Sequence, residues 1–395
     1  MPFPQFISTI LVIALFASCS FSLDGGVSIS QEQLERLNPS ASVLTTPDAT
    51  RCLTINVNPL FEREDFDFMS LVSDIRFVPL QTTTISKIGK PDRLIVTDSH
   101  IYISDSKAVF IFDNVGRFIR KIPFLTSRPH DFAIDRRYGE VFVCADGYVR
   151  HYTAEGEHLW SDQFPFRFNS IAASNDMLIL HCDSNNMNTH LPANVASAPC
   201  LVINRQGALV RHLAPLVSHT PMLRGLRRLQ PMAEGVVMSH SFCDTIFNIV
   251  DDEIRARYVL DYSQNQLFDP AVDGVTQKST GVYFYGGDIV GCQGGIYFRL
   301  RSDRANMFRC FYDAHSGKIA GGVQPIADYC QMPPLYNPMT SIGDNYVSLF
   351  HPYQTESGAT FRFTGDKVSE NEKDKLEGVR HDDNPVVVFF RIHVN

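Results

Sequence analysis

Residues 100–122 read HIYISDSKAVFIFDNVGRFIRKI. Apolar residues recur there at near-alternate positions, and polar turn-forming residues interrupt the runs at 105–106 and 113–116. This pattern predicts three short antiparallel strands joined by tight turns. The second turn contains Gly116, which can adopt the positive φ that closes such a hairpin. A sheet this small cannot bury its own faces, so it must pack against further copies of itself.

Weaker copies of the same turn recur downstream of this stretch. They are HYTAEGEHLW (151–160), VINRQGALVRHL (202–213), IVDDEIRARYVL (249–260) and FYDAHSGKIAGG (311–322). A period of roughly 40 to 55 residues with four strands in each repeat is typical of a β-propeller blade. We therefore predict an all-β fold, a six-bladed β-propeller with four-stranded antiparallel blades.

The expected blades follow one another without a long interruption. They span 93–123, 130–164, 169–213, 226–262 and 282–323, and a sixth begins near residue 336 and resumes at 385–394. A charged stretch at 367–383 interrupts the sixth blade and has Glu and Lys at helical spacing. We interpret this stretch as one short surface helix. A solvated loop is the alternative.

The ring is expected to be closed by strands from both ends of the chain. The segment VVVFFRIHV (386–394) is the most apolar strand of the chain. If its blade lacked a partner strand, it would expose an edge prone to aggregation. The strand DIRFVPLQT (74–82), which belongs to no other blade, supplies that partner. Closure of this kind is common in propellers and removes the open edge.

The first residues indicate a targeting signal. An apolar run at 6–17 is too short to span a bilayer and lies where the core of a signal peptide is expected. The run leads into Leu15-Phe16-Ala17-Ser18-Cys19, which resembles the lipobox of bacterial lipoproteins. This resemblance implies that Cys19 is lipidated and becomes the mature N-terminus. An ordinary signal peptide with an incidental cysteine is the alternative.

The sequence therefore divides into three parts. A lipoprotein signal peptide occupies 1–19, and a flexible tether rich in Ser, Thr, Asn and Pro occupies 20–50. No linker interrupts 51–395, and we interpret it as one propeller domain. A propeller can exceed the usual size of a single domain because each blade packs only on its neighbours. Ser20 follows the lipidated cysteine, and by resemblance to the enterobacterial sorting rule this favours the outer membrane. The expected location is the cell envelope, with the protein facing the periplasm or the surface.

Several segments resemble a known family of proteins. They are DIRFVPLQT at 74–82, IFDNVGRFIRKI at 111–122, FCDTIFNIVDDEIRARYVLDY at 242–262 and DDNPVVVFFRIHVN at 382–395. Together they resemble a family of six-bladed β-propeller lipoproteins found chiefly in the Bacteroidetes, over about residue 54 to the end. The resemblance implies the fold and an envelope location. The family is defined by its fold and has no common activity, so the resemblance leaves the function open.

Composition and motifs exclude several classes of function. The net charge is −8 and the one basic run is at 224–228, which disfavours nucleic acid as a partner. The sequence has no GxSxG, HExxH or EF-hand spacing. We expect no cofactor, and no metal, because a metal site needs three or four convergent ligands. A catalytic triad assembled from distant residues stays open, because triads are recognised by geometry and not by spacing.

The chain has nine cysteines, eight of them after the lipobox. Five lie in strand-like runs spread over several blades: Cys144, Cys182, Cys243, Cys292 and Cys310. Small buried thiols are the favoured interpretation for these five. A single disulfide among the others, Cys52, Cys200 and Cys330, stays open because an exported protein meets an oxidising environment.

An aspartate recurs at the end of strand b in each of blades one to five, where strands are lettered a to d from the axis outward. The positions are Asp105, Asp146, Asp183, Asp244 and Asp303. Aspartate suits the start of a turn because it accepts backbone N–H groups, so a structural role explains this recurrence.

The loops between strands b and c share one face of a propeller with the loops between blades, so polar groups from several blades can meet at the channel mouth. The candidate ligand-binding residues on this face are Arg128, His130, His181, His240, Arg301 and His351. Three tyrosines are interleaved with them: Tyr148, Tyr285 and Tyr353. This combination suits a polar ligand such as a glycan or a peptide.

Two hypotheses of different classes follow. The first is a monomeric, non-enzymatic binding or scaffold propeller, held at the membrane by its N-terminal lipid, that recognises a glycan, peptide or protein partner. The absence of a catalytic motif favours it. The second is a hydrolase or lyase that acts on a glycan or lactone at the channel mouth. A metal held by acidic and His side chains at that mouth would favour the second hypothesis.

Overall fold

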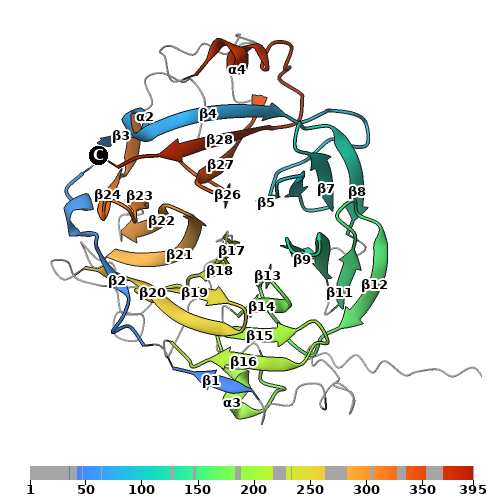
Figure 1. The fold of residues 1–395 in the computed structure, drawn as a ribbon, viewed down its shortest axis with the longest axis vertical. Helices are drawn as coiled ribbons and strands as arrows, with labels where there is room; N and C mark the ends of the chain where they lie inside the picture. The colour runs from blue at the N-terminus through green and yellow to red at the C-terminus, as the bar shows by residue number, and fades with distance from the viewer. Residues whose placement is uncertain are drawn as a thin grey trace, which may run out of the picture.

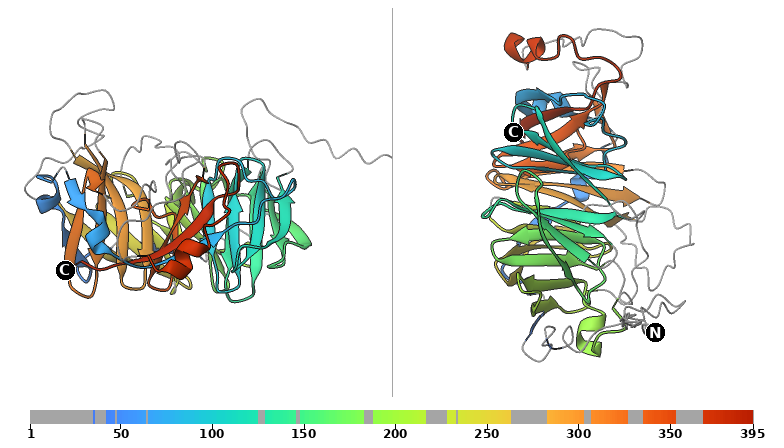
Figure 2. Two further views of the ribbon diagram at one scale, coloured as in Figure 1. Left: turned by 90° about the horizontal axis from the view of Figure 1, so that it is seen from above. Right: turned by 90° about the vertical axis from the view of Figure 1, so that its right-hand side faces the viewer.

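Six antiparallel β-sheets stand around a central axis in the computed structural model (Figure 1). The structure describes residues 35, 42–46, 48–63, 65–124, 129–145, 148–182, 188–216, 228–232, 234–262, 283–302, 307–326, 335–352 and 368–394. Viewed from the side, the sheets form a disc in which the strands run between two faces (Figure 2). The predicted six-bladed β-propeller is therefore confirmed.

Each blade contains four strands, and every pair of neighbours among these four is antiparallel. Blades one to three contain, from the axis outward, β5 (Arg93–Val96), β6 (His100–Ser104), β7 (Ala108–Asp113) and β8 (Phe118–Pro123); β9 (Pro129–Asp135), β10 (Glu140–Ala145), β11 (Tyr148–Tyr152) and β12 (His158–Gln163); and β13 (Ser170–Ser174), β14 (Met177–His181), β15 (Cys200–Asn204) and β16 (Leu209–Leu213).

The remaining blades repeat this arrangement. Blades four to six contain β17 (Leu229–Pro231), β18 (Val236–Met238), β19 (Thr245–Val250) and β20 (Glu253–Asp261); β21 (Tyr283–Cys292), β22 (Gly295–Ser302), β23 (Met307–Asp313) and β24 (Lys318–Gly322); and β26 (Thr340–Ile342), β27 (Asn345–Phe350), β28 (Val386–Ile392) and β4 (Val72–Pro79). The turns between strands a and b and between c and d lie on one face of the disc. The b–c loops and the connections between blades lie on the other.

The core consists of six apolar clusters, one between each pair of neighbouring blades. Strand β7 shows why. Its Val109 and Ile111 pack in the cluster shared with blade two, while Phe110 and Phe112 pack in the cluster shared with blade six. A strand in this position is buried on both faces, so its sequence is continuously apolar. The one charged residue of β7 is therefore Asp113, at the turn that ends the strand.

The sixth blade is assembled from both ends of the chain. Strand β28 pairs with β4 in an antiparallel register in which Val387 faces Val78 and Val388 faces Phe77. This confirms the predicted closure by the segment 74–82. The charged stretch at 367–383 contains the short helix α4 (Glu370–Asp374), as predicted. Glu372 in α4 accepts a hydrogen bond from the backbone N–H of Phe77 at 2.7 Å, so the helix covers the outer edge of blade six.

The segment before β4 runs around the outside of the ring (Figure 1). Strand β1 (Val43–Thr45) pairs in parallel with β16 of blade three, and β2 (Leu53–Asn56) pairs in parallel with β20 of blade four. Strand β3 (Asp65–Asp67) pairs with β25 (Gln324–Ile326) beside blade five. Strand β1 lies inside the segment 20–50 that was expected to be a tether, so the end of that segment is attached to the propeller.

The described helices are all short. Besides α4 they are η1 (Asn58–Leu60), α2 (Phe68–Leu71) and α3 (Ala193–Ala196). In the described ranges, no helix has the length and apolar character that crossing a bilayer requires.

The turn that defined the repeat also joins one blade to the preceding blade. Gly116 has a φ of +89°, and a Cβ there would lie 2.2 Å from the carbonyl oxygen of Pro79 at the end of β4. Gly156 holds the equivalent place in blade two, where a Cβ would lie 2.9 Å from Ile111 of blade one. Glycine is needed at these turns both for the backbone conformation and for the close approach.

Within the described part, seven cysteines are free thiols. Four of the five that were expected in strands are buried, and Cys243 is half-buried. Burial raises the pKa of the Cys310 thiol, because desolvation disfavours the thiolate. These cysteines pack as small apolar side chains, as predicted.

Candidate functional site

One end of the axial channel is filled by Arg93, the first residue of β5 in blade one. Its guanidinium forms an ion pair with Asp131 of blade two and donates to the carbonyl of Leu229 in blade four at 3.4 Å. Asp131 also accepts a hydrogen bond from the backbone N–H of Ile171 in blade three at 2.9 Å. A single buried ion pair therefore ties together the inner strands of four blades.

The other end of the channel is closed by Arg136, which follows β9. Its guanidinium donates to the carbonyl oxygens of Met232 at 3.1 Å, Val96 at 3.2 Å and Ser341 at 3.4 Å, in blades four, one and six. Desolvation by burial lowers the pKa of Arg136, and the nearby carboxylate of Asp98 opposes that shift. Because two arginines occupy the axis, a ligand would bind at a face of the disc and not through its centre.

The structure brings two of the predicted site residues into contact. His181 ends β14 and His240 lies two residues after β18, and their rings are joined by a hydrogen bond of 3.1 Å between Nε2 and Nδ1. Both side chains are fully buried. Arg228, which precedes β17, lies beside them and donates to the hydroxyl of Ser241. The sequence placed both histidines at the end of strand b, and that register is confirmed.

Burial controls the charge of this histidine pair. Desolvation, with the charge of Arg228 as a second cause, lowers the pKa of His240 to about 3. Desolvation also lowers the pKa of His181 well below its ordinary value, and His240 and Arg228 add to that shift. Both rings are therefore neutral near pH 7, and one donates to the other. Among the described residues, His240 Nε2 has no hydrogen-bond partner. It can donate or accept, depending on the tautomer of the pair.

The pair predicts a loss of stability in mild acid. Below pH 6.5 the two histidines become protonated in the unfolded chain but stay neutral in the folded protein. The stability that is present above pH 6.5 is therefore lost as the pH falls. Each histidine contributes about 1.4 kcal/mol per pH unit, or roughly 2 kcal/mol for each between pH 7 and pH 5. Urea unfolding at the two pH values measures this loss. The variant His181→Asn/His240→Asn should reduce the difference by about 4 kcal/mol. An unchanged pH dependence in the variant would contradict the assignment.

The other predicted site residues are less closely connected. Arg301 in β22 and His351 after β27 are half-buried, and desolvation lowers the pKa of His351. His130 lies in β9, but its side chain, like the whole of Arg128, lies outside the described residues. The chain topology puts the ends of these strands on the same face as the histidine pair.

Among the recurrent aspartates, Asp105 has the predicted structural role. Asp105 accepts hydrogen bonds from the backbone N–H groups of Lys107 at 2.7 Å and Ala108 at 3.0 Å, which forms the turn after β6. Asp244 bonds the hydroxyl of Thr245. The positions 146, 183 and 303 lie outside the described residues.

The three tyrosines do not form a set at the channel mouth. Tyr285 is buried in the core between blades four and five, because it alternates inward along β21. Its proposed place at the ligand-binding face is therefore wrong. Tyr148 is 45% exposed at the start of β11, and Tyr353 lies outside the described residues.

A pocket that the sequence did not indicate lies on the opposite face, between blades six and one. Its volume is about 360 Å³. Polar groups from several turns and strands line it: Arg76, Thr97, Asp98, Asn114 and Asn345. Ile101 and Phe389 form part of its apolar wall, and the Arg76 guanidinium lies 3.9 Å from the centre of the Phe389 ring. At the axial end of the pocket, Val96 is part of the lining, and its carbonyl accepts a hydrogen bond from Arg136. Arg136, which we call the channel plug, therefore borders the pocket.

The turns that form this pocket are fixed by local hydrogen bonds. The Asn114 amide donates to the carbonyl of Asp98 at 3.1 Å, which joins the two turns of blade one. The Asn345 amide reaches the carbonyl of Ile342 at 3.5 Å across the a–b turn of blade six. These contacts hold amide and carboxylate groups at the pocket wall. No sequence motif indicates this pocket, because its lining residues come from segments spread over some 300 positions, from 76 to 389.

A second pocket, of about 150 Å³, lies between blades five and six on the same face. Asp313, His315, Asp344, Arg391 and His393 contribute to its lining. In the part of the chain that the structure describes, no group of three or more His, Cys, Asp or Glu side chains is placed to hold a metal ion.

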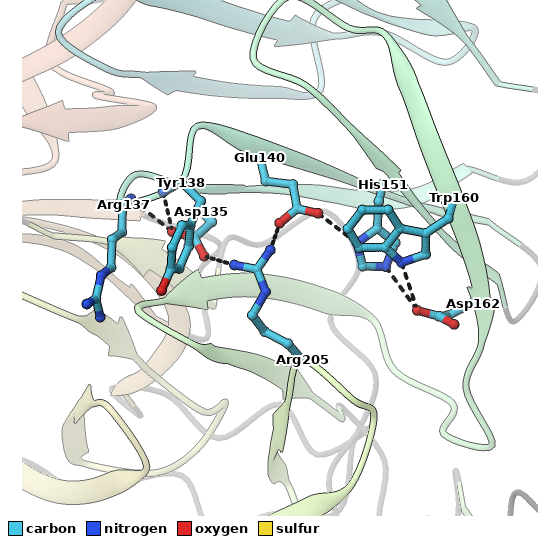
Figure 3. Close-up of polar contacts among 8 residues, drawn as sticks. All are labelled: Asp135, Arg137, Tyr138, Glu140, His151, Trp160, Asp162 and Arg205. Atoms are coloured by element: carbon cyan, nitrogen blue, oxygen red, sulfur yellow. Dashed lines mark hydrogen bonds and ion pairs between the residues drawn. The ribbon is translucent and has the colours of Figure 1, made fainter.

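A polar network crosses the boundary between blades two and three (Figure 3). Arg205, in the c–d turn of blade three, donates to Asp135 at 3.1 Å and pairs with Glu140 of blade two. Its guanidinium lies 4.5 Å from the centre of the Tyr138 ring. Because Asp135 and Glu140 are buried, the two carboxylates depend on the single positive charge of Arg205, which they share.

The same network extends to the outer edge of blade two (Figure 3). His151 lies between Glu140, 3.1 Å from Nδ1, and Asp162, 3.3 Å from Nε2. Its ring stacks on Trp160 with 4.4 Å between the ring centres. Desolvation lowers the pKa of His151, and Asp162 opposes the shift. The cluster joins two blades and also supports the exposed indole.

Comparisons with known proteins support the fold. The family described as "Domain of unknown function (DUF4934)" matches residues 52–391. A Bacteroides fragilis protein predicted to be exported has a similar structure, with a TM-score of 0.63 and 14% identity, over 87% of this chain and 100% of that chain. BamB of Moraxella catarrhalis matches with a TM-score of 0.39 and 11% identity, over 82% and 100% of the two chains. No curated protein sequence matches significantly.

Proposed function

The chain belongs to the DUF4934 family, a domain of unknown function, and from the geometry of its own residues we propose that it is a non-enzymatic binding module of the cell envelope. The fold supports this proposal because a propeller offers a rigid disc on which loops from several blades can form a binding site. The similar Bacteroides fragilis protein, predicted to be exported, supports a place outside the cytoplasm.

The pocket between blades six and one carries the proposal. Its volume of about 360 Å³ falls in the range of ligand sites, which begins near 300 Å³. The turns that line it are held in place by their own hydrogen bonds, so little ordering is required when a ligand binds. Arg136, the channel plug, bonds the carbonyl of Val96 at the axial end of the pocket and so holds that part of the lining in place.

The lining residues favour a glycan as the ligand. Asn114 and Asn345 supply both donors and acceptors, Asp98 supplies acceptors and Arg76 supplies donors. A sugar hydroxyl both donates and accepts, so adjacent hydroxyls can be matched by such a mixed set. Ile101 and Phe389 add apolar atoms to the same wall.

The experiment is a binding measurement by calorimetry, with short neutral and acidic oligosaccharides as the first set of probes and short peptides as the second. For the sugar that binds, Asp98→Ala and Asn345→Ala should each weaken binding by roughly tenfold, which is about 1.4 kcal/mol for one lost hydrogen bond. The matched control is Asp176→Ala, which changes an aspartate in the equivalent a–b turn of blade three and should leave the affinity unchanged.

Other outcomes distinguish the remaining hypotheses. Binding of peptides and not sugars would overturn the glycan assignment. Loss of binding in His240→Gln, with normal binding in the pocket variants, would place the ligand on the opposite face, at the site predicted from the sequence. Release of shortened sugars from the probes would contradict the non-enzymatic role and favour the hydrolase or lyase.

The location proposal includes a lipid at Cys19, which the lipobox-like sequence before it motivates. We expect metabolic labelling with a fatty-acid analogue to mark the wild-type protein and not the Cys19→Ser variant. The labelled protein should fractionate with the outer membrane. Equal labelling of both proteins would exclude Cys19 as the site of acylation.

A further inference from the structure

The outer edges of the six blades differ in what covers them (Figure 1). Strand β1 covers blade three and β2 covers blade four. Strand β3 lies beside the outer strand of blade five, and α4 covers that of blade six. Among the described residues, β8 of blade one and β12 of blade two are the outermost strands of their sheets. Two neighbouring edges therefore remain open for pairing.

Of these two edges, β12 is the one built to accept a partner. Strand β8 carries Arg120, Lys121 and Pro123, and charged residues and proline are means by which edge strands resist pairing. Strand β12 reads HLWSDQ, and its Leu159 and Trp160 are 46% and 45% exposed. An edge strand that exposes two large apolar side chains is prone to aggregation unless something covers it.

The covered edges show where a partner would pair. Strand β1 pairs with β16 from Arg211 to Leu213, and Arg211 lies four residues after the turn glycine Gly207. Trp160 lies four residues after the equivalent Gly156. By this equivalence, the pairing segment on blade two is 160–162. It contains the exposed indole that stacks on His151 (Figure 3).

The chain order indicates which segment reaches this edge. Followed backwards from β2, the N-terminal segment passes from blade four to β1 on blade three, and the next blade in that direction is blade two. Upstream of β1 the sequence at 26–30 is GVSIS, in which apolar and polar residues alternate as in a strand. Twelve residues (31–42) separate it from β1, against seven (46–52) between β1 and β2. Its reach is therefore sufficient.

We propose that residues 26–30 add to the edge of β12 as a parallel strand beside 160–162 and cover Trp160. The N-terminal segment is then a strap and not a free tether. Only six residues (20–25) lie between this strand and Cys19. If Cys19 carries a lipid, as proposed above, the rim of blade two is held within about 20 Å of the bilayer. The disc would meet the membrane by that edge.

Trp160 is the only tryptophan of the chain, so its fluorescence reports on this edge alone. The test compares quenching by acrylamide in the full mature chain, made soluble by Cys19→Ser, with the same chain carrying Val27→Asp and Ile29→Asp. Because the uncovered indole is 45% exposed, the two substitutions should increase quenching about twofold. The matched control, Leu34→Asp with Leu37→Asp, adds the same charge to the same segment and should leave quenching unchanged.

Two results would overturn the proposal. The first is equal quenching in the chains with and without the substitutions at 27 and 29, with far-ultraviolet circular dichroism confirming that both are folded. The second is protection that rises with protein concentration and persists in the substituted chain, because a second copy would then cover β12. Failure of glycan binding would not bear on this test, since the pocket and the edge lie on different blades.

Discussion

A chain that ends at Asp383 is expected to be insoluble. The deletion of 384–395 removes β28, whose side chains from Val386 to Phe390 are all buried, with exposed fractions of 3% or less. They belong to two core clusters, between blades five and six and between blades six and one. Their loss exposes the edges of β27 and β4 together, and such edges aggregate. Expression of the truncated chain, followed by separation of soluble and pelleted protein, measures the outcome.

A point variant of the same strand gives a graded form of this test. Phe390→Ala should destabilise the protein by about 3 to 5 kcal/mol, because it opens a cavity in a packed core. Arg391→Ala in the same strand changes an exposed side chain and should cost less than about 0.5 kcal/mol. A soluble truncated protein with an unchanged melting temperature would show that β28 does not close the ring in solution.

The second large effect is expected at Arg205. Arg205→Leu leaves Asp135 and Glu140 buried without their cation, and the removal of one partner from a buried ion pair typically costs 3 to 5 kcal/mol. Urea unfolding measures this cost. The matched control is Arg120→Leu, because Arg120 joins blade one to Glu157 of blade two in the same way. That pair is exposed, at 47% and 66%, and should contribute less than about 1 kcal/mol.

Removal of the carboxylate charges should restore much of the lost stability. In the triple variant Arg205→Leu/Asp135→Asn/Glu140→Gln, Arg205 and both of its carboxylate partners lose their charge together. Comparison of the single and triple variants therefore separates the charge effect from the packing of Arg205 on Tyr138. Equal instability of the single and triple variants would assign the effect to packing. His151 would still bond the residue at 140.

The sequence predicted the blades because their determinants are local. The turn at Gly116 and the alternation along β7 lie within one hairpin, and the repeat follows from its copies. The closure by 74–82 was also predictable, because one apolar strand at the C-terminus needed a partner. The strands β1 and β2 were missed since each has three or four residues, too few to show a period.

The contacts that join blades were not predictable from the sequence. Arg93 meets Asp131 and Leu229 across the axis, and no pattern in the chain indicates which residues of different blades face one another there. The histidine pair was predicted in part, because His181 and His240 each follow from the position of a strand b. Their mutual hydrogen bond was not. The pocket between blades six and one was missed because it exists only after the two chain ends have met.

Closure of the sixth blade by both termini also determines when the protein can fold. Phe77 and Val388 are partners in the register of β4 and β28, and 311 residues separate them. Closing a free chain of that length costs of order 5 kcal/mol in entropy, so the preceding blades must form before this pairing is favourable. The complete ring cannot form until synthesis of the C-terminal strand has ended.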